Sequence, residues 1–82
     1  MGIDKAGRLA ILAAERGPLE HELYTAQIQL ETKEAGVEHG ATGVTQEQVE
    51  EAKARVEGIE AQIAVIDDNR KKVKLEEDEP TE

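Results

Sequence analysis

The feature that most constrains this chain is a repeat of mainly apolar side chains, at alternating steps of three and four residues (a 3-4 repeat), in its C-terminal half. Its positions are Val49, Ala52, Val56, Ile59, Ile63, Ile66, Arg70 and Val73. Steps of three and four residues place these side chains on one stripe of an α-helix, with the period of about 3.5 residues that marks a coiled-coil seam. Another helix must cover such a stripe, so the repeat predicts helix packing.

The signals at the start of this second helix agree with the repeat. Thr45 and Gln48 have the spacing of a capping box, and Val44 and Val49 have the spacing of the hydrophobic staple that accompanies it. Acidic residues gather near the start and basic residues near the end, as the helix dipole favours. We therefore predict an unbroken helix over residues 46–74.

The N-terminal half carries the same spacing with one interruption. Its positions are Leu9, Leu12, Arg16, Leu19, Leu23, Ala26, Leu30, Lys33 and Val37. Gly17 and Pro18 interrupt this repeat, and an interior proline costs a helix about 3 kcal/mol. Because the repeat keeps its phase, we predict one helix over 5–36, kinked at 17–18. The alternatives are two collinear helices, 5–16 and 18–36, or a true turn that would give three helices.

The segment between the two repeats contains glycines and no periodicity. Residues 37–44 form a connection long enough to reverse the chain, and either Gly36 or Gly40 is suited to end the first helix in the left-handed conformation. The predicted fold class is therefore all-α, an antiparallel helical hairpin with coiled-coil-type packing over residues 1–75. The acidic residues 76–82 have nothing to bury, so we expect a disordered tail.

Chain length and composition predict that the hairpin is oligomeric. One small domain fits in 82 residues, and the single aromatic residue, Tyr24, leaves two helices little bulk for a core. Ile59 and Ile66 fall at d positions, where β-branched residues favour three or four helices. The expected packing and oligomer interface comprises Leu12, Leu19, Leu23, Leu30, Val49, Ala52, Val56, Ile59, Ile63, Ile66 and Val73.

A second stripe lies on the opposite side of the second helix. It consists of Ala54, Gly58, Ala61 and Val65, at steps of four, three and four. Two interpretations are open: an ordinary alanine-rich helix surface, or a second packing face that lets another helix approach closely. Arg16 and Arg70 occupy seam positions, where we expect their long stems to reach outward at the ends of the packed region.

The charge of the chain is concentrated at its C-terminal end. The formal net charge is −9, and it is −4 without the five acids of the tail. Those acids, which are also the residues expected to contact a basic partner, are Glu76, Glu77, Asp78, Glu79 and Glu82. An acidic chain has no general attraction for nucleic-acid phosphates or anionic membranes, so we expect neither as a partner.

The sequence contains little that could support catalysis. It has no cysteine, and its two histidines, His21 and His39, lack metal-ligating neighbours at helical spacing. Its glycines do not form a phosphate-binding loop. The carboxylates are expected on solvated helix faces rather than in a desolvating pocket. We therefore predict no catalytic, cofactor or metal site and no enzymatic activity.

These patterns favour a non-enzymatic structural or assembly protein that self-associates or docks into a larger protein assembly through its helical stripes. The alternative is a small acidic inhibitor of the basic, nucleic-acid-binding surface of a target protein. No apolar run approaches the ~18 residues of a membrane span. Asp4 and Arg8 interrupt any signal-peptide pattern, so a cytoplasmic or particle-associated location, such as a virion, is expected.

Overall fold

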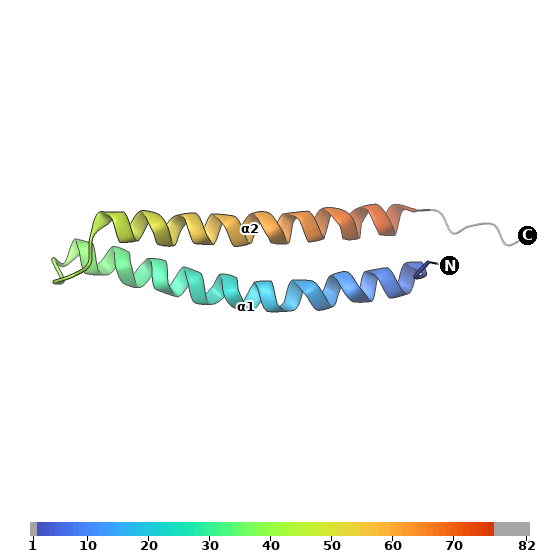
Figure 1. Ribbon diagram of the computed structural model, residues 1–82, viewed down its shortest axis with the longest axis horizontal. Coiled ribbons are helices and arrows are strands. Elements are labelled where there is room, and N and C mark those ends of the chain that lie inside the picture. Colours follow the sequence, from blue (N-terminus) through green and yellow to red (C-terminus); the bar gives the residue numbers. More distant parts are fainter. Residues whose placement is uncertain (1, 77–82) are drawn as a thin grey trace, which may run out of the picture.

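The chain folds into two long helices that run antiparallel, side by side (Figure 1). The computed structural model describes residues 2–76 and places α1 at Lys5–Glu38 and α2 at Gln46–Leu75. Both ends of the described chain lie at one end of the hairpin, and the connection lies at the other. Residues 2–76 contain no strand. The predicted all-α antiparallel helical hairpin is confirmed.

The first helix continues through its proline. Asp4 caps α1 by accepting a hydrogen bond from the N–H of Gly7 at 2.7 Å, and Pro18 lies inside the helix. Figure 1 shows the axis of α1 changing direction in its light-blue to cyan middle part. The two alternatives, collinear separate helices and a three-helix arrangement, are wrong. Leu12 and Leu19, on either side of the interruption, both turn toward α2, and this shared packing holds α1 together.

A glycine in the left-handed conformation ends α1, two residues later than predicted. Gly40 has φ of 71° and donates to the carbonyl of Val37 at 3.2 Å, while the N–H of Ala41 donates to the carbonyl of Gly36 at 2.7 Å. This pair of bonds is the Schellman motif, which satisfies carbonyls that the helix end leaves free. Gly40, rather than Gly36, is therefore the terminating glycine.

Gly36 has a different function, because Val44 packs directly against it. A Cβ atom at position 36 would lie 3.1 Å from the side chain of Val44, closer than ordinary van der Waals contact. The chain then enters α2 through Thr45, whose hydroxyl accepts a hydrogen bond from the N–H of Gln48 at 3.2 Å. The glycine thus allows the residue before the cap to fold back onto α1.

The core between the helices is narrow and is built mainly from α2. Its buried side chains are Ala26, Val49, Val56, Ile59, Ile63 and Val73. Leu19, Leu23 and Leu30 of α1 pack against this cluster but stay half-buried. A single neighbouring helix covers only one stripe of a helix, so the long leucine side chains keep one flank in contact with water.

Candidate helix-packing surfaces

The residues predicted as a packing and oligomer interface lie along the seam inside a single hairpin. Leu12, Leu19, Leu23, Leu30, Ala52 and Ile66 are half-buried, and Val49, Val56, Ile59, Ile63 and Val73 are buried. The stripe of α2 thus finds its covering helix in the same chain. Contacts with another chain must use the half-buried flanks of this seam or the outer faces of the helices.

Arg16 links the two helices in the half of the hairpin that lies nearer its open end. Its Nε donates to Oδ1 of Asp67 at 2.6 Å, a second guanidinium nitrogen donates to Oδ2 at 3.1 Å, and a third contacts Glu20. The side chain of Arg16 was expected to reach outward into solvent. Instead, its guanidinium group binds the carboxylate of Asp67 on α2 through two hydrogen bonds, the bidentate geometry that suits a carboxylate. Arg70, the other seam arginine, lies 4.0 Å from the same carboxylate. The hydrogen bonds from Arg16 hold the pKa of Asp67 below its ordinary value.

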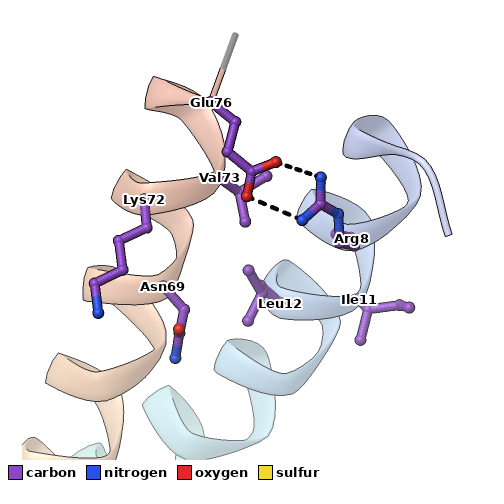
Figure 2. Close-up of a pocket in the computed structure, with 7 residues that line it drawn as sticks. All are labelled: Arg8, Ile11, Leu12, Asn69, Lys72, Val73 and Glu76. Carbon is purple, nitrogen blue, oxygen red and sulfur yellow. Dashed lines mark hydrogen bonds and ion pairs between the residues drawn. The ribbon is translucent and has the colours of Figure 1, made fainter. Parts of the chain in front are cut away.

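The open end of the hairpin is held by a second cluster of polar contacts (Figure 2). Arg8 donates two hydrogen bonds to the carboxylate of Glu76, at 2.6 and 3.0 Å. Lys5 donates to the backbone carbonyls of Lys74 and Glu76, at 3.2 and 3.0 Å. Lys5 thereby satisfies carbonyls that the end of α2 leaves free. The pairing with Arg8 also lowers the pKa of Glu76.

This cluster corrects one expectation about the acidic tail. Glu76 was expected to begin a disordered tail, yet its carboxylate binds Arg8 of its own chain. Its expected contact with a partner stays a prediction. Arg8 and Glu76 are 68 positions apart, so no local pattern predicts their contact. The other residues proposed for partner contact, Glu77, Asp78, Glu79 and Glu82, lie outside the described residues.

The second stripe of α2 faces away from α1. All four of its residues are exposed, and 60% of Val65 is accessible to solvent. A Cβ atom at Gly58 would meet no atom within 4 Å. The stripe is therefore uncovered in a single hairpin, a placement that suits both interpretations of it.

A comparable face on α1 was missed by sequence reasoning. Each of its residues follows a seam residue by one or two positions, which is about 100° or 200° around the helix, so that together they lie opposite the centre of the leucine seam. We call it the neutral face, and its exposed residues are Ala10, Ala14, Gly17, His21, Tyr24, Ile28, Thr32 and Ala35. Most of its residues are small or polar, so no repeat of large apolar side chains marks it. The sequence signal for this face is a series of uncharged residues at steps of three and four, from Ala10 to Ala35.

Grooves beside the seam are open and apolar rather than enclosed. One, of about 550 Å³, is lined by Ile11, Ala14, Pro18 and Leu19 with Glu15 and Gln62. Another, of about 400 Å³, lies beside the Arg8–Glu76 pair (Figure 2). Within residues 2–76, no group of three or more His, Asp or Glu side chains is placed to hold a metal ion.

Comparisons of the chain with models of protein families, with curated proteins and with solved structures found no match. Neither described helix contains a stretch that is long and apolar enough to cross a membrane. Functional inference therefore depends on the surfaces of the hairpin itself.

Proposed function

We propose that this protein is a non-enzymatic structural or assembly protein, which associates with its own copies or within a larger protein assembly through helix packing. The observation that carries the proposal is the contrast between a thin core and exposed apolar side chains. Only six hydrophobic residues of the described chain are buried. Tyr24, Ile28, Ile11 and Val65 remain between 45% and 67% exposed.

The energetics of a two-helix hairpin support the same proposal. Small scaffolds need a disulfide, a metal or oligomerisation to supplement a core of this size. The sequence contains no cysteine, so a disulfide is excluded. A further helix on the flanks of the seam would bury the exposed sides of Leu19, Leu23 and Leu30, at about 25 cal/mol for each Å² of apolar surface removed from water.

Light scattering coupled to size-exclusion chromatography tests the proposal. We expect the purified chain to have a mass that is a multiple of 9.0 kDa, and its melting temperature to rise with protein concentration. A fully helical protein with a mass of 9.0 kDa and a melting temperature independent of concentration would contradict self-association.

A further inference from the structure

We propose that the neutral face of α1 is the surface on which a second copy of this chain docks, with α1 against α1. The inference rests on the proposed function and specifies both the surface and the partner. Two hairpins joined in this way form a four-helix assembly with α1 helices at its centre. A twofold arrangement of this kind is the commonest symmetry of soluble oligomers.

Charge is distributed unevenly around α1. The helix contains ten charged residues, and none of them lies on the neutral face. Charged residues make up 35% of the whole chain, and the outer face of a solvated helix is normally where they gather. Here the outer face of α1 lacks them from Ala10 to Ile28, and the exposed Glu31, seven positions beyond Tyr24, lies at its edge. A face that avoids charge in this way is suited to contact with protein.

Large apolar side chains lie on and beside this face. Tyr24 and Ile28 lie one helical turn apart on it, with 67% and 46% of their surface exposed. Ile11, 45% exposed, and Pro18 border it and line the groove that continues toward Gln62 of α2. These side chains offer area to bury, a single aromatic ring being worth roughly 150–250 Å².

Small residues occupy the remaining positions of the face. Ala10, Ala14, Gly17 and Ala35 are exposed, and a Cβ atom at position 17 would meet nothing within 4 Å. The distance between packed helices depends on the side chains at the contact, so small residues let another helix axis approach closely. Tyr24 and Ile28 of one copy can then lie over the small residues of the other.

Charge also identifies the partner as a second copy. Two chains that each have a formal net charge of −9 repel one another over most of their surfaces. The repulsion is smallest where neither chain presents a charge, and the neutral face meets this condition when it contacts itself. A strongly basic partner would be attracted instead to the acidic surfaces that surround it.

The available area favours α1 over the second stripe of α2. At about 1.5 Å per residue, residues 10–35 extend for about 39 Å, with a footprint of roughly 400 Å² on a helix about 10 Å wide. The groove beside Ile11 and Pro18 widens this footprint. Two copies that dock through it therefore bury a total of about 1,000 Å², close to the minimum area of a biological interface. The stripe over residues 54–65 extends for only about 18 Å, with a footprint of roughly 200 Å².

Two neighbouring alanines provide a matched test of the face. Ala14 lies on the neutral face and Ala13 lies beside it, and both are exposed, so Ala14→Glu and Ala13→Glu make the same chemical change in the same turn. We expect Ala14→Glu, and likewise Ile28→Glu, to raise the dissociation constant of the oligomer at least about tenfold, because docking would bury an unpaired charge. Ala13→Glu should change it less than about threefold. Circular dichroism should show that all variants keep their helix content.

Disulfide cross-linking adds a direct readout, since the natural chain has no cysteine. Single-cysteine variants at Ala10, Gly17, His21 and Ile28 place a thiol along the neutral face, and Ala64→Cys places one on the exposed surface of α2. In a twofold α1–α1 contact, the variant nearest the axis should cross-link with its own copy on mild oxidation. Ala64→Cys should not.

The possible results separate this inference from the proposed function. An oligomer that withstands Ala14→Glu and Ile28→Glu but dissociates with Ala61→Glu would overturn the α1 contact, while self-association would stand. A natural chain that remains monomeric would overturn both the α1 contact and self-association. Equal loss of association in Ala13→Glu and Ala14→Glu, or cross-linking in Ala64→Cys alone, would also overturn the assignment to the neutral face.

Discussion

At the scale of single residues, the hairpin combines a narrow apolar seam with a few ion pairs between the helices. Arg16 and Asp67 connect α1 to α2, whereas within residues 2–76 Asp68 pairs with Lys72 of its own helix. Pairs between helices restrict how the helices slide along one another. A pair within one helix, such as Asp68–Lys72, stabilises only its own turn, by a few tenths of a kcal/mol.

The lowered pKa of Asp67 predicts a pH-dependent contribution to folding. Arg16 lowers this pKa below its ordinary value of 3.8, so the contribution is fully present at a pH above that value and is lost as pH falls through the lower, folded pKa. We expect Asp67→Asn to be less stable than the natural chain near pH 7. The difference should shrink below about pH 4 and disappear in stronger acid.

Urea denaturation over a pH series measures this effect. Asp68→Asn is the matched control, because the neighbouring carboxylate contacts no residue of α1. It should lower the free energy of unfolding near pH 7 by less than Asp67→Asn. If Asp67→Asn lost as much stability in strong acid as at neutral pH, the Arg16 contact would not be the cause.

Truncation of a buried isoleucine should lower the stability far more than truncation of an exposed apolar residue on the same helix. Ile59 is 5% exposed and Val65 is 60% exposed on the same helix. We expect Ile59→Ala to lower the free energy of unfolding by about 2–4 kcal/mol, because it leaves a cavity in the core. Val65→Ala should change it by less than about 0.5 kcal/mol in the dissociated chain. Equal effects, measured by urea denaturation, would place the core elsewhere.

At the scale of elements, the helix ends are set by particular glycines and caps. Gly40 and Gly43 have positive φ, of 71° and 86°, whereas Gly58 lies within α2 with open space around it. Pro18 shows that an interior breaker is tolerated where the apolar residues on both sides pack on one partner helix. Local propensity and tertiary packing thus compete along α1, and packing prevails.

The same substitution at two glycines should have opposite effects on stability. Gly40→Ala forces a side chain into the left-handed region and should destabilise the chain by about 1–2 kcal/mol. Gly58→Ala should stabilise α2 by about 0.5–1 kcal/mol, because alanine loses less backbone entropy in a helix. Thermal denaturation followed by circular dichroism checks both signs. A stabilising Gly40→Ala would be incompatible with the Schellman end of α1.

At the scale of the whole molecule, the connection closes one end of the hairpin and polar contacts hold the other. Lys5 and Arg8 at the start of α1 bind the end of α2 through the backbone of Lys74 and both the backbone and the carboxylate of Glu76. Because these are exposed ion pairs and hydrogen bonds, salt should weaken them. They prevent fraying of the terminal turns rather than contribute to the core.

Two changes near the C-terminus should therefore differ in effect. Glu76→Gln removes the charge that Arg8 binds and should speed amide hydrogen exchange in the last turn of α2 and the first turn of α1. A chain that ends at Glu76 keeps this contact and should exchange at the rates of the full-length chain. If the shortened chain frayed and Glu76→Gln did not, the Arg8 contact would be irrelevant to the open end.

Sequence alone determined the features that depend on neighbouring residues. The 3-4 repeat, the cap at Thr45 and the glycine-containing connection predicted two helices and a reversal, because helix formation and capping act over about four residues. The tertiary structure decided which glycine ends α1, since Val44 occupies the space above Gly36. It also brought Arg16 to Asp67 and Arg8 to Glu76, across 51 and 68 positions. The neutral face was present in the sequence, but only the packing of the leucine seam against α2 determined that it faces outward.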